Sequence, residues 1–252
     1  MAITKTEGIV LRYTNLGEAD KILTILTRNK GKIKAVAKGC RKPKSNMLAS
    51  TELFAFSEFV LYKGTNLYQV TQAETREIFY NLRNDLLKLS YAVFFVDMAD
   101  AVSEEELPSE RLFMLLAKTL YYLAAGEIPV GIINEAYQLK IMDISGYRPS
   151  LQTCVRCGKD EPQGYKFDIE MGGVICKECE KLGTGIIKIS PGTLETIRLL
   201  LNTEISRLNT IKIDNTIFNE VDKLVKRFVE THLDKHFKSL DFLNEIKNNN
   251  MK

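Results

Sequence analysis

Two Cys-x-x-Cys pairs constrain this chain more than any other feature of its sequence. Cys154 and Cys157 lie in the segment TCVRCGK, and eighteen residues separate them from Cys176 and Cys179 in ICKECEK. A pair at this spacing places two thiolates at adjacent corners of a tetrahedron, and two pairs complete the four-sulfur site typical of structural zinc. We expect one zinc ion with no open coordination position, so that the metal folds the segment and runs no chemistry.

The segment 151–182 is expected to form a zinc-ribbon-like insert around these pairs. Between them, Tyr165–Ile169 predicts a short strand and Met171–Gly173 predicts a hairpin turn. Disulfides are the alternative, but the chain has five cysteines, an odd number, and it carries charge at Lys5 and Glu7, where a secretory signal needs an apolar run. No apolar run approaches the ~18 residues of a membrane span. We therefore expect free thiols, a cytoplasmic location and no membrane partner.

Positive charge is concentrated in the first part of the chain. The net charge is only +3, but residues 1–44 hold eleven Lys and Arg against three acidic residues, a balance of +8, which leaves −5 for the remainder. Such an asymmetry indicates that one end of the chain handles a polyanion.

Hydrophobic periodicity divides the chain into a strand region and a helical region. Alternation with a period of two predicts five strands near 7–13, 20–28, 31–38, 52–63 and 66–75. Five short antiparallel strands in this length favour a small closed barrel, most often an oligonucleotide-binding (OB) fold. We expect a multidomain α+β protein, with a five-stranded OB-fold β-barrel over 1–80 and an all-α helical domain over 81–252 that carries the four-cysteine zinc-ribbon-like insert.

Apolar residues that recur every three or four positions predict the helices of the second region. They fall near 82–96, 112–123 and 130–145, from Ser190-Pro191 to Leu201, and over 214–236. Ser190 is expected to cap its helix, with proline in the first turn. The apolar stripes of these helices indicate core packing and no separate function.

The third strand predicts a nucleic-acid-binding face. Ile33, Ala35 and Ala37 alternate with Lys32, Lys34 and Lys38, so the three lysines share the outward face. Arg28 and Lys30 lie on the adjoining hairpin, and the loop GCRKPKS adds Arg41, Lys42 and Lys44. A solubilising surface is the alternative, but OB barrels use the face of strands two and three for nucleic acid. No aromatic residue occurs from Thr14 to Leu53, so we expect contacts with phosphates and little base stacking.

The motifs of common enzymes are absent from the sequence. It contains no phosphate-binding Gly-x-x-x-x-Gly-Lys-Ser/Thr loop and neither Gly-x-Gly-x-x-Gly nor Gly-x-Ser-x-Gly. His232 and His236, four residues apart on the last predicted helix, are expected to be surface residues, and Glu104–Glu106 are expected to form a solvated helix cap. Cys40 lies among basic residues that would make its thiol reactive, but an ordinary thiol in a loop is the preferred interpretation. We expect no enzyme activity and no catalytic residue.

Taken together, these residues resemble the recombination mediator RecO family in its zinc-containing form. The matching segments are EGIVLRYTNLGEADKILTILTRNKGKIKAVAKG, RKPKS, LYKGTNLYQVTQAE, LRNDLLKLSYA, ISGYRPSLQTCVRCGK, FDIEMGGVICKEC and HFKSLDFL. They follow one another in the family's order from about residue 7 to residue 243, which is nearly the whole chain.

The resemblance implies a role in recombinational DNA repair without bond-breaking chemistry. Such proteins bind single- and double-stranded DNA, anneal complementary strands and help to load the RecA recombinase onto coated single strands. The implied partners are DNA, RecR, the acidic C-terminal tail of the single-stranded-DNA-binding protein and, functionally, RecA. The implied location is the cytoplasm, in association with the nucleoid.

The family's DNA contacts are spread over a basic face, so the resemblance extends only to basic positions in the matching segments. These are Arg12, Lys21, Arg28, Lys32, Lys34, Lys38, Arg41, Lys42 and Lys44. Lys21 follows Glu18 and Asp20 in the family's E-x-D-K motif, and a structural ion pair is its alternative role.

Three other functions compete with this interpretation. The first is an RNA- or transcription-associated protein with an OB barrel and a zinc ribbon but no annealing activity. The second is a scaffold whose helical domain carries the function, with an incidental basic face. The third is a nuclease, which the lack of converging carboxylates disfavours.

Overall fold

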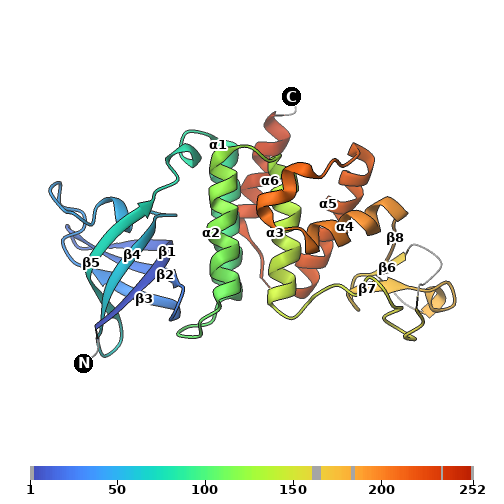
Figure 1. The fold of residues 1–252 in the computed structure, drawn as a ribbon, viewed down its shortest axis with the longest axis horizontal. Coiled ribbons are helices and arrows are strands. Elements are labelled where there is room, and N and C mark those ends of the chain that lie inside the picture. Colours follow the sequence, from blue (N-terminus) through green and yellow to red (C-terminus); the bar gives the residue numbers. More distant parts are fainter. Residues whose placement is uncertain (1–2, 161–165, 183–184, 234, 251–252) are drawn as a thin grey trace. The chain divides into compact units, whose positions relative to one another are not determined.

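The computed structural model describes residues 3–160, 166–182, 185–233 and 235–250, which form two compact units (Figure 1). The first unit contains the chain up to Gly126 together with the C-terminal segment from Phe237, and the second contains Glu127–His236. The predicted domain boundary at residue 80 lies inside the first unit, where strands give way to helices. None of the described helices combines the length and the hydrophobicity that a membrane span requires.

Five strands of the first unit close into a barrel. They are β1 (Ile3–Leu16), β2 (Asp20–Thr27), β3 (Gly31–Ala37), β4 (Phe56–Lys63) and β5 (Tyr68–Glu77). Neighbouring strands follow the order β1-β2-β3-β5-β4, and every pairing is antiparallel except that of β3 with β5. A five-stranded barrel of this order is OB-like, which confirms the predicted fold.

Alternation along β3 fills the barrel as the sequence predicts. Ile33 and Ala35 are buried in the core, and Ile33 lies opposite Ile25 of β2. Because successive side chains of a strand point to opposite faces, Lys32 and Lys34 are directed away from this core.

Three helices complete the first unit. They are α1 (Leu86–Val102), α2 (Glu110–Ala125) and α6 (Lys238–Asn250). The side chain of Asp85 caps α1 by accepting from the N–H of Lys88 at 3.0 Å, and Ser109 caps α2 in the same way. Gly126, with φ +75, ends α2 in the left-handed conformation that glycine adopts at little steric cost.

The helix predicted over 214–236 is wrong at its C-terminal end. α5 (Asn215–His232) stops at His232, and α6 is a separate helix that the periodicity did not reveal. Between them, Phe237 is buried, and its ring meets that of Phe94 in α1 edge-on, with centroids 5.7 Å apart. A tertiary contact, absent from any local pattern, therefore sets the course of the chain at this point.

The second unit combines the remaining helices with a small sheet. Its elements are α3 (Val130–Ile144), β6 (Lys166–Asp168), β7 (Gly173–Ile175), β8 (Ile186–Lys188), α4 (Pro191–Asn202) and α5, and the strands lie in the order β7-β6-β8. β6 falls within the predicted strand 165–169, of which Tyr165 lies outside the described residues. Ser190 caps α4 as predicted, accepting from the N–H of Thr193 at 3.2 Å.

The α1–α2 connection, residues 103–109, runs along the first part of β3. The N–H of Lys32 donates to the carbonyl of Glu104 at 3.3 Å, and the N–H of Glu106 donates to the carbonyl of Lys32 at 3.0 Å. Since β5 pairs only with residues 35–37 of β3, this connection occupies an edge that would otherwise present unpaired backbone groups.

Gly31 provides a test of this close approach. It has φ +68, and a Cβ atom there would lie 2.2 Å from the carbonyl oxygen of Leu107. We expect Gly31→Ala to destabilise the first unit by about 2–4 kcal/mol, because the substitution adds steric overlap to left-handed backbone strain. Urea unfolding followed by circular dichroism measures the change.

Gly17→Ala is the matched control, because Gly17 also has a positive φ, +58, but open space around it. It should cost only the backbone strain, about 1–2 kcal/mol. Equal losses in the two variants would contradict the inferred contact with the α1–α2 connection.

Candidate metal centre and nucleic-acid interface

The four predicted metal ligands converge at one point of the second unit. The Sγ atoms of Cys154, Cys157, Cys176 and Cys179 all lie within 4.8 Å of one another. The Sγ atoms of Cys157 and Cys176 are 3.7 Å apart, and a tetrahedral zinc ion with Zn–S bonds of about 2.3 Å holds its sulfurs about 3.8 Å apart. The donor set therefore fits one tetrahedral metal ion that prefers sulfur.

Backbone hydrogen bonds shape the turn of the first cysteine pair and reach the sulfur of Cys154. Gly158 adopts φ +73, which glycine tolerates, and its N–H donates to the carbonyl of Cys154 at 2.8 Å. The N–H of Cys176 donates to the Sγ of Cys154 at 3.3 Å. A hydrogen bond from an N–H group to sulfur favours the thiolate over the thiol.

The thiols differ in how readily they ionise. Burial opposes ionisation of Cys154, but hydrogen bonds from the backbone of Cys176, Cys157 and Arg156 outweigh it and lower the pKa of this thiol to about 6. Burial raises the pKa of Cys179 to about 12, and hydrogen bonds with the neighbouring thiols add to the rise. Four thiolates at this separation repel one another, so a bound cation is what allows all four to ionise together.

Arg156 ties the first cysteine pair to the small sheet. Its Nε and Nη2 atoms donate to the Oδ2 atom of Asp168 at 2.8 and 2.5 Å, and the side chain of Asp168 is fully buried. The other carboxylate oxygen of Asp168 accepts from the N–H of Met171 at 3.1 Å. Because a buried carboxylate is costly without a partner, this pair fixes the loop between Cys154 and Cys157.

The sheet is attached in turn to α5. Phe167 of β6 packs edge-on against Phe228, with centroids 5.9 Å apart, and the Nε2 atom of His232 lies 2.8 Å from the carbonyl oxygen of Ile169. His232 is therefore half-buried and holds the metal-binding segment, contrary to its prediction as a surface residue. His236 lies beyond the end of α5, so the predicted histidine pair on one helix is also wrong.

On the barrel, Lys21 is a structural residue. Its side chain is buried, and its Nζ atom donates to the Oε1 atom of Glu52 at 2.9 Å and to the carbonyl of Thr51 at 3.2 Å. The same ammonium lies 4.0 Å from the ring centroid of Tyr13. These contacts favour the ion-pair alternative for Lys21 over contact with DNA.

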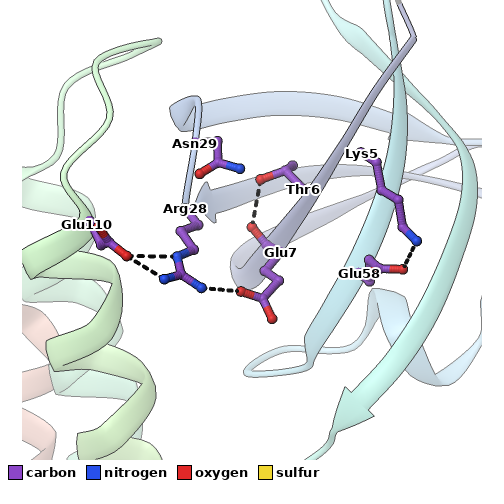
Figure 2. A pocket seen from close by; sticks show the side chains of 7 residues that line it. All are labelled: Lys5, Thr6, Glu7, Arg28, Asn29, Glu58 and Glu110. Atoms are coloured by element: carbon purple, nitrogen blue, oxygen red, sulfur yellow. Dashed lines mark hydrogen bonds and ion pairs between the residues drawn. The ribbon is translucent and has the colours of Figure 1, made fainter.

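Four other predicted DNA-contact residues bind carboxylates of the first unit, and we name them the paired cations. Arg12 lies 3.0 Å from Asp100, Lys32 lies 3.1 Å from Asp100, Lys34 lies 2.6 Å from Glu105, and Arg28 lies 2.5 Å from Glu110 and 3.0 Å from Glu7. Figure 2 shows Arg28 between Glu110, which reaches it from α2, and Glu7 of β1. The acids of the α1–α2 region thus neutralise much of the predicted basic face.

Glu104–Glu106 are exposed to solvent, as predicted, but they do not cap a helix, because two of them pair with basic side chains of the barrel. Glu105 pairs with Lys34, and Glu106 accepts from the Nζ of Lys63 at 2.8 Å and from the hydroxyl of Tyr68 at 2.9 Å. No local pattern signals these contacts, because they depend on the return of the α1–α2 connection to barrel strands that lie far earlier in the sequence.

The remaining predicted DNA-contact residues, which we name the loop cations, lie just after β3. They are Lys38, Arg41, Lys42 and Lys44. Lys38, Lys42 and Lys44 are exposed, and Arg41 donates to the carbonyl of Gly17 at 3.0 Å. Among the described residues, none of the four has a carboxylate partner. Their charge is therefore available to a polyanion.

Two residues hold this loop in place. The Oδ1 atom of Asp20 accepts from the N–H of Gly39 at 2.7 Å, and Cys40 is fully buried in the barrel core. Burial removes the access that a reactive thiol needs, so Cys40 is a packing residue. Asp20 is a positioning residue that the sequence analysis missed, although its place before Lys21 in the E-x-D-K motif was a usable signal.

The fold and the site define an OB-fold protein with a basic loop, a helical region and a four-cysteine metal-binding motif. The family model described as Recombination protein O N terminal matches residues 1–79, and the model described as Recombination protein O C terminal matches residues 83–241. The chain belongs to the RecO family, which confirms the resemblance found in the sequence.

Curated relatives agree with this assignment over their whole length. The chain is 39% identical to the DNA repair protein RecO of Alkaliphilus metalliredigens strain QYMF over 245 residues, which are 97% of this chain and 100% of that protein. It is 36% identical to the DNA repair protein RecO of Thermoanaerobacter sp. strain X514 over 248 residues, covering 98% and 100% of the two chains.

Asp168→Asn tests the anchor of the metal-binding segment. The amide keeps the shape of the side chain but leaves Arg156 without a counter-charge. We expect a loss of about 2–4 kcal/mol, because one partner of a largely buried ion pair is removed. Metal affinity should fall by about tenfold or more, as for other groups that orient metal ligands. Chelator competition and thermal unfolding measure the two effects.

Lys159→Ala is the control from the same segment. Lys159 pairs with Glu178, and both side chains are mostly exposed, so this variant should leave metal affinity and stability unchanged. If Asp168→Asn retained its metal as well as Lys159→Ala does, Arg156 and Asp168 would have no role in holding the cysteine loop.

Proposed function

We propose that this protein is a DNA-binding recombination mediator that acts in recombinational DNA repair without catalysing a covalent step. In this proposal it binds single- and double-stranded DNA through phosphates and anneals complementary strands. Together with RecR, it helps to load RecA onto single strands coated by the single-stranded-DNA-binding protein, whose acidic C-terminal tail is a further partner. It acts in the cytoplasm at the nucleoid.

The observation that carries the DNA-binding proposal is the unpaired charge of the loop cations. Lys38, Lys42 and Lys44 are exposed and follow β3 of an OB-like barrel in a chain of the RecO family. Cations without an internal counter-charge release the condensed counterions of DNA when they bind its phosphates, and this release favours binding at low salt.

The barrel offers little for holding bases, and this favours annealing. Residues 14–53 contain no aromatic side chain. Of the nearby rings, Tyr13 lies against the ammonium of Lys21, and Tyr68 is buried with its hydroxyl bound to Glu106. A surface that neutralises phosphates without stacking on bases leaves the pairing edges free. Two complementary strands held in this way repel each other less and can pair.

We infer that the metal of the four-cysteine site is a structural zinc ion. Four sulfur donors leave no open position for a substrate, and zinc is the usual ion of such closed sites. Cys154 and Cys157 are fixed by the Arg156–Asp168 pair, while Cys176 and Cys179 follow β7. When bound, the ion supplies the cohesion that a segment with a small apolar core lacks.

The combined variant Lys38→Glu, Lys42→Glu and Lys44→Glu tests DNA binding. If the four loop cations each contact one phosphate, log K for single strands should fall against log [salt] with a slope of about −2.8 in the native protein. The variant should have a slope of about −0.7 and should lose single- and double-strand binding in parallel. It should also anneal complementary strands slowly, whether naked or coated. Fluorescence anisotropy and strand-annealing assays measure these effects.

A matched control reverses three exposed lysines of the second unit, Lys212, Lys223 and Lys226. This control carries the same net charge, so it should bind and anneal DNA almost normally if the position of the charge matters. A native affinity that hardly changes with salt, or equal losses in the two variants, would refute the role of the loop cations.

Metal analysis tests the structural zinc. We expect about one zinc ion per chain by mass spectrometry, and we expect Cys157→Ser to lower this content strongly. Chelation should expose protease sites within residues 151–182 and leave the barrel intact, because the metal stabilises only its own segment. A chain with no bound metal and unchanged proteolysis would contradict the proposal.

A further inference from the structure

An acidic strap covers one face of the barrel. We give this name to Asp100 at the end of α1, Glu105 and Glu106 in the α1–α2 connection, and Glu110 at the start of α2. Its carboxylates lie 2.5–3.1 Å from five basic side chains of the barrel, namely Arg12, Arg28, Lys32, Lys34 and Lys63. These cations are therefore occupied by carboxylates of the same chain.

The backbone fixes the position of the strap. Hydrogen bonds join Lys32 to Glu104 and Glu106, and Gly31 leaves just enough room for the carbonyl of Leu107. Glu105 and Glu106 therefore belong to a segment whose backbone pairs with the edge of β3. The carboxylates are held at the barrel even when an individual ion pair opens.

Most of these ion pairs remain open to solvent. The side chains of Lys34 and Glu105 are 53% and 60% exposed, whereas Lys32 and Asp100 form a largely buried pair. Exposed pairs are weak and are screened by salt. A hydrogen bond from Lys34 lowers the pKa of Glu105, and one from Lys63 lowers the pKa of Glu106, so both glutamates are ionised at neutral pH.

Carboxylates and phosphates compete for the same partners. Both present negatively charged oxygens that accept hydrogen bonds from Arg and Lys. In OB folds, the face that includes strands two and three is a common nucleic-acid surface, and the strap neutralises that face here. The loop cations lie beyond the reach of the strap carboxylates, since none of them pairs with an acid among the described residues.

We propose that the acidic strap is an intramolecular competitor of DNA. Its carboxylates occupy positions on the barrel that phosphates would otherwise take, and they confine DNA to the loop cations. This inference rests on the proposed function, because it specifies how the DNA-binding surface of that function is limited. A weakly held strand is one that the protein can pair and release, and the strap keeps the contact weak.

The variant Glu105→Gln, Glu106→Gln and Glu110→Gln tests the competition. The amides preserve side-chain shape and hydrogen bonding but remove charge, and the buried Asp100 is left in place. With two or three more phosphates bound, the slope of log K against log [salt] should steepen by about 1.4–2.1 on single strands. Affinity at low salt should rise about tenfold. Unchanged affinity and slope would overturn the proposal.

A control for net charge replaces three exposed acidic residues elsewhere with glutamine, Glu195→Gln, Glu230→Gln and Glu245→Gln. It should raise affinity less than twofold, whereas a gain equal to that of the strap variant would show that only total charge matters.

Lys34→Gln, made both in the native protein and in the strap variant, provides a second test. It should change the affinity of the native protein little but should remove part of the gain in the strap variant. An equal loss in both backgrounds would overturn the competition.

The loop variant separates this inference from the proposed function. If reversal of Lys38, Lys42 and Lys44 abolishes salt-dependent binding while the strap variant binds like the native protein, only the competition fails. If the native protein and both variants all lack salt-dependent DNA binding, the proposed function fails as well. Circular dichroism of each variant confirms that the comparison is between folded proteins.

Discussion

The ion pairs between the barrel and the α1–α2 region decide how much positive charge this protein offers to a polyanion. Without them, the outer side of β3 would form a continuous basic surface with the loop that follows. With them, Arg12, Arg28, Lys32 and Lys34 face carboxylates, and only the loop cations remain unpaired among the predicted contact residues that the structure describes. A surface of this kind favours weak, salt-sensitive contact with phosphates, and weak contact is compatible with the proposed annealing of strands.

The four-cysteine segment depends on a different constraint. Its thiols meet because a left-handed turn at Gly158 and the buried pair of Arg156 with Asp168 hold the first two cysteines against the sheet. The sheet is in turn fixed to α5 through Phe228 and His232.

The predictions that failed share one physical cause. Glu104–Glu106 were expected to form only a solvated helix cap, but Glu105 pairs with Lys34 of β3 and Glu106 pairs with Lys63 of β4. Cys40 was expected to be an ordinary thiol in a loop, but its side chain is buried in the barrel core. His236 lies past the end of α5. α6 begins at Lys238, directly after Phe237, whose ring packs against Phe94. Each of these outcomes depends on contacts between residues that are distant in the sequence.

The sequence by itself determined the barrel, most of the helices and the four-cysteine cluster, because strand alternation, helical periodicity and Cys-x-x-Cys spacing are local patterns with few structural solutions. It also determined the resemblance to the RecO family. Only the tertiary structure decided which basic residues remain available. Lys34 and Lys38 are equivalent in the alternation of the predicted strand 31–38, yet Lys34 faces Glu105 and Lys38 has no acidic partner among the described residues. Charge pairing depends on distances in space, and the sequence encodes these distances only through the complete fold.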